Sequence, residues 1–118
     1  MSDFPVTIFH NPACGTSRKV LAMIRAAGHE PKVVEYLKVG WTRAQLEGLL
    51  GAMSTGPAAI LRLREALANE LGLTDRSVNG ERILDAMVAH PVLVNRPIVV
   101  TPKGAALCRP AEAVNPLL

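Results

Sequence analysis

The first 36 residues constrain the fold more than any other part of the chain, because their hydrophobic periodicity changes twice. Residues 5–10 contain the alternating run Val-Thr-Ile-Phe that is typical of a strand, and residues 17–27 carry apolar side chains at helical spacing. Gly28 is placed to end that helix, and a second apolar run at 32–36 predicts another strand. A strand, a helix and a strand within this length predict a right-handed unit with two parallel strands, in which loop 11–16 leads into the helix.

Three helices are predicted next, in a block that spans about residues 42–90. Thr42 and Gln45 have the spacing of a capping box, which marks the start of the first helix. Gly56 and Pro57 precede the second helix, where proline is favoured at the first helical position. The three predicted helices cover residues 42–51, 57–72 and 80–89.

The chain ends in a predicted hairpin and a short helix. Residues 98–101 and 105–108 are apolar runs of strand length, separated by a Pro-Lys-Gly turn. A short helix is predicted at 111–114. A parallel pair of strands followed by an antiparallel hairpin predicts an α/β fold with a thioredoxin-like mixed sheet. We expect one domain, residues 1–118, with a helical insertion at about 42–90.

The composition argues against several classes of function. Of the 118 residues, 49% are hydrophobic, which is enough for a core, and 3% are aromatic. The net charge is +3, but the basic residues are scattered, so we expect no nucleic-acid partner. No apolar stretch approaches 18 residues and no secretion signal is visible, so we expect no membrane association. Two cysteines without a Cys/His cluster predict a cytoplasmic chain without a metal site.

Cys14 lies on the turn between the first strand and the first helix, a position that favours a thiolate. Backbone N–H groups and the dipole at a helix start stabilise a negative sulfur, and cysteine pKa values there fall from about 8.5 to between roughly 3.5 and 7.5. Gly15 allows a bound anion to approach the backbone closely. Thr16 or Ser17 is expected to cap the helix and to donate its hydroxyl to the sulfur. A buried cysteine that only fills space is the alternative, but it leaves these neighbours unexplained.

Three arginines elsewhere in the chain are candidates to hold an oxyanion. Arg96 precedes Pro97 at the start of a predicted strand, where the X–Pro bond is a candidate cis peptide that would turn Arg96 toward the Cys14 loop. Arg109 follows the last predicted strand, and Arg62 lies on the second inserted helix. Guanidinium groups bind tetrahedral oxyanions through paired hydrogen bonds. For Arg96 and Arg109 we favour this role over that of an ordinary surface residue.

The Cys14 loop contains a single thiol. The position three residues after Cys14 is Ser17, so the loop lacks the second cysteine of a Cys-x-x-Cys redox pair. It also differs from a Cys-x5-Arg phosphatase loop, because Val20 stands six residues after Cys14. A single attacking thiolate without a local partner requires a thiol from another molecule. Cys108 is the second cysteine of the chain, and its place at a strand end favours a structural role.

The chain resembles the glutaredoxin-coupled arsenate reductases in three motifs that are specific when taken together. They are His-Asn-Pro-Ala-Cys-Gly-Thr-Ser-Arg at 10–18, Asn-Arg-Pro-Ile-Val-Val-Thr-Pro at 95–102 and Leu-Cys-Arg-Pro at 107–110. By that resemblance, Cys14 would be the nucleophile that forms a thioester with arsenate, and Arg96 and Arg109 would hold the oxyanion.

The resemblance also implies roles for other residues. His10 would help to lower the pKa of Cys14. The family's third arginine maps most simply onto Arg62, with Arg64 as the alternative because residues 56–59 depart from the family pattern. The loop residues expected to bind or activate the substrate are His10, Asn11, Gly15, Thr16 and Ser17. No bound cofactor is implied; glutathione would be a co-substrate and glutaredoxin a partner.

Two other functions fit these residues. A Spx-type transcription regulator, which binds RNA polymerase, has a similar fold but usually carries Cys-x-x-Cys where this chain has Cys14 and Ser17. A related thiol reductase that acts on a substrate other than arsenate would have much the same sequence.

Overall fold

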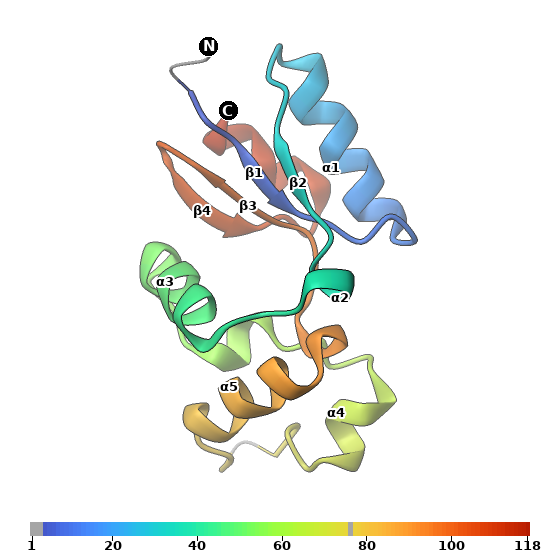
Figure 1. Ribbon diagram of the computed structural model, residues 1–118, viewed down its shortest axis with the longest axis vertical. Helices are drawn as coiled ribbons and strands as arrows, with labels where there is room; N and C mark the ends of the chain where they lie inside the picture. The colour runs from blue at the N-terminus through green and yellow to red at the C-terminus, as the bar shows by residue number, and fades with distance from the viewer. Residues whose placement is uncertain (1–3, 76) are drawn as a thin grey trace. The chain divides into compact units, whose positions relative to one another are not determined.

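The computed structural model describes residues 4–75 and 77–118, and the chain divides into two compact units. The first unit comprises residues 1–39 and 96–118, and the second comprises residues 40–95 (Figure 1). The expected organisation as one domain with an insertion at about 42–90 stays a prediction. In the described part of the chain, no helix combines the length and hydrophobicity needed to cross a membrane.

A four-stranded mixed sheet forms the centre of the first unit. Its strands are β1 (Thr7–Phe9), β2 (Lys32–Val34), β3 (Ile98–Thr101) and β4 (Gly104–Leu107). The strand order is β2-β1-β3-β4. β1 and β2 are parallel, whereas β1 with β3 and β3 with β4 are antiparallel. The predicted combination of a parallel pair and a C-terminal hairpin is therefore confirmed.

The helices of this unit are α1 (Gly15–Ala26), α2 (Tyr36–Val39) and the 3-10 helix η3 (Ala111–Leu117). α1 begins before the predicted residue 17, and η3 extends past the predicted 111–114. α2 is unpredicted, because the expected strand 32–36 ends at Val34. The backbone N–H groups of Lys38 and Val39 both donate to the carbonyl oxygen of Glu35, which starts a helical turn directly after the strand.

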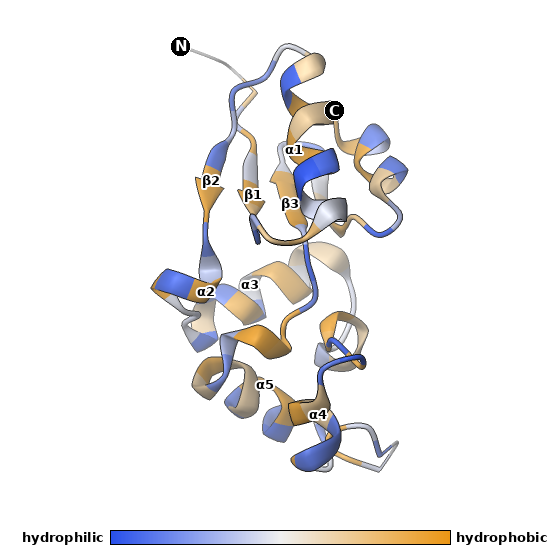
Figure 2. Cartoon of the chain, turned by 90° about the vertical axis from the view of Figure 1, so that its right-hand side faces the viewer, coloured by the Kyte–Doolittle hydropathy of each residue, from blue (hydrophilic) through white to orange (hydrophobic). Residues whose placement is uncertain are grey.

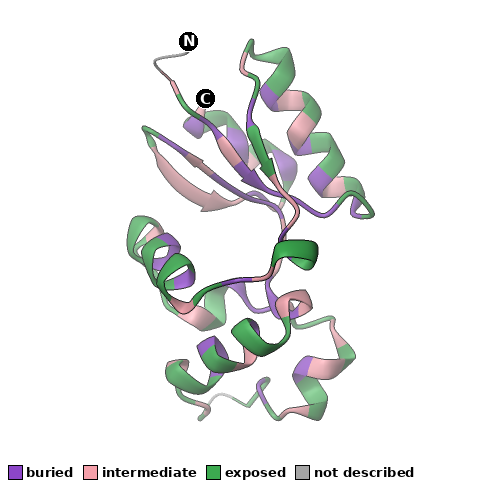
Figure 3. Ribbon diagram, in the orientation of Figure 1, coloured by how far each residue is buried: buried purple, intermediate pink, exposed green. Residues whose placement is uncertain are grey.

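One buried hydrophobic cluster of the first unit lies on one face of the sheet. Ile8 on β1 and Val99 on β3 are opposite each other in the register and are fully buried. They pack in one cluster with Val20 and Ile24 of α1 and with Val114 of η3. Figure 2 shows β3 coloured mostly as hydrophobic, and Figure 3 shows α1 with buried positions on one side and exposed positions on the other. Each buried side chain of this size contributes roughly 1.5–3 kcal/mol to folding.

The second unit is built from short helices. They are α3 (Arg43–Met53), η1 (Pro57–Ile60), α4 (Ala66–Glu70), α5 (Gly80–Ala89) and η2 (Pro91–Leu93). The predicted capping box is confirmed, because the Thr42 hydroxyl accepts from the Gln45 N–H and the Gln45 side chain accepts from the Thr42 N–H. Asn79 caps α5 in a similar way, with its side chain accepting from the N–H of Arg82.

The predicted continuous helix over 57–72 is wrong. After η1 the chain is extended, and Leu61 forms an antiparallel bridge with Val94. The N–H of Arg62 donates to the carbonyl oxygen of Leu93 at 2.8 Å, so it is not available for a helical bond. Helix resumes only at α4, and neither Arg62 nor Arg64 lies on a helix.

Candidate active site

Cys14 is the N-cap residue of α1 and lies at the end of the loop that leaves β1. Its N–H donates to the carbonyl oxygen of Asn11 at 3.0 Å, and its own carbonyl oxygen accepts the N–H of Arg18 at 3.0 Å. The first N–H groups of a helix have no intrahelical acceptor, so they are available to an anion. The residue is 9% exposed, which restricts access to its sulfur.

Three groups donate hydrogen bonds to the Cys14 sulfur. Nη1 of Arg109 lies 3.5 Å from it. The backbone N–H of Ser17 and the guanidinium of Arg96 also donate to it. The same Nη1 of Arg109 donates to the backbone carbonyl oxygen of Arg96 at 3.1 Å. Arg96 and Arg109, two of the predicted arginines, therefore meet at the predicted cysteine.

These donors favour the ionised form of Cys14. Burial is the largest influence and raises the pKa, but the Ser17 N–H and the Arg96 and Arg109 side chains together outweigh it. The result is a Cys14 pKa that is lowered to about 7. Because the pKa is lowered, the sulfur is a thiolate above about pH 7 and a thiol below it.

Cys108 has the opposite environment. Its side chain is fully buried in the cluster between the sheet and the helices, and burial raises the pKa of its thiol to about 12. Its sulfur lies 3.6 Å from the carbonyl oxygen of Ala106. A thiol that stays protonated and enclosed is unreactive, which agrees with the structural role expected for Cys108.

The prediction that Thr16 or Ser17 caps the helix and donates its hydroxyl to the sulfur is wrong. α1 has no side-chain cap. Oγ of Ser17 instead lies 2.6 Å from Nδ1 of His10 and accepts the N–H of Asn11 at 3.1 Å. Side chains in a helix lean toward its N-terminus, and from its position the Ser17 hydroxyl faces the end of β1. Ser17 interacts with the Cys14 sulfur through its backbone N–H, which donates a hydrogen bond to it.

Two further contacts fix the shape of the loop. Oδ1 of Asn11 accepts the N–H of Ala13 at 3.0 Å, which is an Asx turn. The guanidinium of Arg18 donates to the carbonyl oxygen of Pro12 at 2.8 Å. The sequence indicated Arg18 only as a nearby positive charge, and its role in closing the loop was not predicted.

The proline bonds next to the two arginines are both cis. The Arg96–Pro97 bond was predicted to be cis, and this is confirmed. The Arg109–Pro110 bond is also cis and was missed, although Arg109 is followed by proline just as Arg96 is.

Gly15 begins α1 without a conformational need for glycine. A Cβ built on it would lie 3.7 Å from the guanidinium of Arg18, which is an ordinary contact, and its φ is not left-handed. The fold therefore tolerates a side chain at this position, and the expectation that Gly15 lets an anion approach the backbone stays a prediction.

Arg62 belongs to the second unit, where two side chains hold it. Its Nε lies 3.3 Å from a carboxylate oxygen of Glu65, and its Nη1 donates to Oδ1 of Asn95 at 3.3 Å. Arg64 is exposed. The expected role of Arg62 as the third anion-binding arginine stays a prediction.

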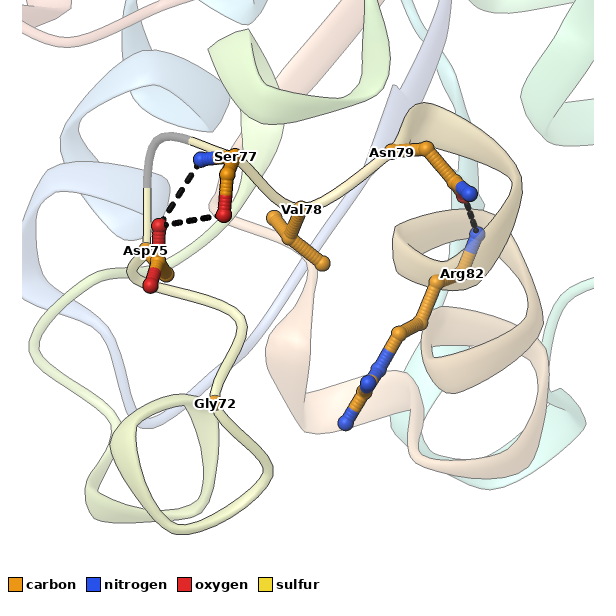
Figure 4. Close-up of a pocket in the computed structure, with 6 residues that line it drawn as sticks. All are labelled: Gly72, Asp75, Ser77, Val78, Asn79 and Arg82. Carbon is orange, nitrogen blue, oxygen red and sulfur yellow. Dashed lines mark hydrogen bonds between the residues drawn. The ribbon is translucent and has the colours of Figure 1, made fainter.

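A separate pocket of about 300 Å³ lies in the second unit (Figure 4). Its lining residues are Gly72, Asp75, Ser77, Val78, Asn79 and Arg82. Asp75 accepts from both the N–H and the hydroxyl of Ser77, so its carboxylate is already engaged. None of the site residues predicted from the sequence lines this pocket. Over residues 4–75 and 77–118, no three His, Cys, Asp or Glu side chains gather as a metal site would require.

The fold and the site together define a class of protein. The mixed sheet, with α1 and η3 packed beside each other on one face, is thioredoxin-like. Cys14 lies at the start of α1, and two arginines donate hydrogen bonds to its sulfur. The chain is therefore a thiol protein with one activated cysteine.

Known proteins narrow this class to one family. The family model described as "ArsC family" matches residues 9–117, and the chain belongs to the ArsC family. Arsenate reductase ArsI1 from Synechocystis is 53% identical over 100% of this chain and 82% of that protein. The arsenate reductase of Escherichia coli K12 is 48% identical over 96% of this chain and 80% of that protein. The solved structure of an arsenate reductase from Vibrio cholerae matches with a TM-score of 0.93 and 35% identity, over 99% of this chain and 100% of that one.

Proposed function

We propose that the chain is an arsenate reductase in which Cys14 is the nucleophile. The observation that carries the proposal is the Cys14 sulfur held 3.5 Å from the Arg109 guanidinium, in a chain 45–55% identical to proteins named arsenate reductase. A thiolate beside guanidinium groups is suited to a tetrahedral oxyanion, because the arginines offset the charge of both nucleophile and substrate.

In the first step the Cys14 thiolate bonds to arsenic and one arsenate oxygen leaves as water after protonation. Arg96 and Arg109 hold the remaining oxygens, and the open N–H groups of Gly15 and Thr16 at the start of α1 add further donors. His10, Asn11 and Ser17 hold the loop that carries the nucleophile. On the sequence motif, we assign the third anion-binding arginine to Arg62.

The remaining steps require thiols from other molecules, because the residue three positions after Cys14 is a serine and Cys108 is enclosed. A glutathione thiol attacks the adduct, and arsenic gains two electrons as the Cys14 and glutathione sulfurs are joined in a disulfide. A glutaredoxin thiol then cleaves that disulfide and restores Cys14, and arsenite is the product. Glutathione is thus a co-substrate, and we expect the chain to work in the reducing cytoplasm.

A coupled assay tests the proposal. NADPH oxidation, measured with glutathione reductase present, should require arsenate, glutathione, glutaredoxin and intact Cys14 together. Cys14→Ser should abolish the NADPH oxidation. Cys108→Ala should retain most of it, because the Cys108 thiol is enclosed and stays protonated. Phosphate should compete weakly without being turned over, since thiols do not reduce phosphorus(V).

Two outcomes would overturn the proposal. Oxidation that persists in Cys14→Ser would remove Cys14 from the reaction. A wild-type chain that shows no arsenate-dependent oxidation with the full thiol system, but binds RNA polymerase, would be a regulator instead.

A further inference from the structure

Arg18 lies beside the Cys14 loop, but it is not one of the groups that donate to the sulfur. Its N–H donates to the carbonyl oxygen of Cys14, so the two residues are one helical turn apart on α1. Side chains of a helix lean toward its N-terminus, which brings the Arg18 guanidinium back over the start of α1. Its Nη2 lies 3.7 Å from the place where a Cβ on Gly15 would stand.

One nitrogen of the Arg18 guanidinium is bonded to the loop, and the residue is otherwise open to solvent. Nη1 donates to the carbonyl oxygen of Pro12 at 2.8 Å, which fixes the side chain beside the loop. Arg18 is exposed, whereas Cys14 is buried. A guanidinium has five N–H donors in a planar fork. A single bond to a carbonyl oxygen therefore leaves donors for a second acceptor.

Arg18 lacks the carboxylate partner that the other cations of α1 have. Lys19 pairs with Glu112 at 3.1 Å, and Arg25 pairs with Glu30 at 3.1 Å. In the part of the chain that the structure describes, no aspartate or glutamate forms an ion pair with Arg18, and α1 itself contains no acidic residue. A positioned guanidinium without an acidic partner is suited to an acidic group of another molecule.

The position of Arg18 favours an acidic group on the attacking thiol over an oxygen of arsenate. The pKa of Cys14 is lowered by Ser17, Arg96 and Arg109. Arg18 is not one of these groups, so it lies outside the set of donors that faces the sulfur. The second thiol of the reaction comes from solvent, and Arg18 is on the exposed side of the loop. Glutathione carries two carboxylates, so a fixed cation there can orient its thiol.

We propose that Arg18 binds a carboxylate of the thiol co-substrate and thereby selects anionic thiols such as glutathione. A carboxylate held by Arg18 limits the positions that the attached sulfur can reach, and this favours its approach to Cys14. The role in catalysis rests on the proposed function. The attraction of an anionic thiol compound to Cys14 does not, because it can be measured without arsenate.

The reaction of Cys14 with oxidised glutathione is that measurement. The Cys14 thiolate attacks one sulfur of the disulfide, the S–S bond breaks, and one glutathione leaves as a thiolate while the other stays bonded to Cys14. Arg18→Ala should slow this reaction about fivefold at low salt, and the difference should shrink at high salt. Mass spectrometry of the intact protein follows the attached glutathione. Cys108 stays protonated and does not contribute.

Three comparisons separate recognition of charge from a role in the shape of the loop. Bis(2-hydroxyethyl) disulfide is uncharged, so Arg18→Ala should react with it at the wild-type rate. Arg18→Gln keeps an amide donor for the Pro12 carbonyl oxygen and removes the charge, so it should lose as much rate with oxidised glutathione as Arg18→Ala. Lys19→Ala is the matched control, because Lys19 is the neighbouring cation and already pairs with Glu112. It should change that rate by less than about twofold.

An equal loss of rate with both disulfides would overturn the proposal, because it would assign Arg18 to the structure of the loop alone. Equal losses in Arg18→Ala and Lys19→Ala would also overturn it, since they would indicate only the general charge of the surface. In the coupled assay, Arg18→Ala should raise KM for glutathione and leave KM for arsenate unchanged. The reverse result would place Arg18 on the oxyanion instead. A wild-type chain that does not reduce arsenate would overturn the proposed function and leave the result with oxidised glutathione standing.

Discussion

Nη1 of Arg109 lies 3.5 Å from the sulfur of Cys14, although the two residues are far apart in the sequence. The same nitrogen donates to the backbone carbonyl oxygen of Arg96 at 3.1 Å, which ties the Arg109 side chain to the residue just before β3. The guanidinium is thus held in place before any substrate arrives, so little side-chain freedom is lost when an oxyanion binds.

Replacing Arg109 with Ala should therefore reduce turnover by orders of magnitude, because the transition-state charge loses a fixed donor. Arg96→Ala should act in the same way, and Arg109→Lys should recover only part of the loss, since an ammonium lacks the paired donors. The coupled assay gives kcat and KM for each variant.

Arg82→Ala is the control for these variants, because Arg82 donates to the Leu71 carbonyl oxygen in the second unit. It should leave turnover nearly unchanged. Arg76→Ala is a second control, and residue 76 lies outside the described residues. Equal and mild effects at positions 82, 96 and 109 would show that there is no oxyanion clamp.

The two cysteines should differ in their reaction with iodoacetamide. The Cys14 rate should rise with pH about a midpoint near 7, because the lowered pKa makes the thiolate available there, while Cys108 with a pKa of about 12 stays unmodified in the folded protein. Mass spectrometry of the two peptides after timed alkylation measures both rates. A Cys14 midpoint near 8.5, the value of a free thiol, would contradict the stabilisation by Ser17, Arg96 and Arg109.

The sequence predicted the sheet because its signals are local. The alternation before Cys14, the capping box at Thr42 and the hairpin turn after β3 each determine the structure within a few residues. The start of the helical segment at Pro57 also has a local signal. The predicted continuation of the helix through Leu61 is wrong. The backbone of Leu61 pairs with Val94, and no local pattern shows a partner so distant in the sequence.

The residues of the candidate site were easier to predict from the sequence than the contacts between them. Cys14, Arg96 and Arg109 were identified, and the structure brings all three together. The hydroxyl of Ser17 was assigned to the wrong partner, because the direction of a helical side chain depends on where the helix begins. α1 begins at Gly15 with Cys14 as its N-cap, and this turns the hydroxyl toward His10.

The choice between Arg62 and Arg64 can be made by substitution. Contacts with Glu65 and Asn95 fix the orientation of the Arg62 side chain, as is expected of a residue that binds a ligand. Arg64 is exposed. Arg62→Ala should therefore raise KM for arsenate or lower kcat by at least tenfold, and Arg64→Ala should do neither. Thermal unfolding of both variants checks that the difference is not one of stability. A larger loss in Arg64→Ala would assign the third arginine to position 64.

Gly15 and Gly28 form a matched pair for a last prediction, because they begin and follow the same helix. Gly28 has φ +92, a conformation that strains other residues, so Gly28→Ala should cost about 1 kcal/mol or more in the free energy of unfolding and leave KM for arsenate unchanged. Gly15→Ala should leave stability unchanged or slightly higher, but its methyl group stands where an oxyanion would approach the backbone, so KM for arsenate should rise several-fold. Urea titration and the coupled assay measure the two quantities. A Gly15→Ala variant with normal KM would show that the substrate does not approach the start of α1.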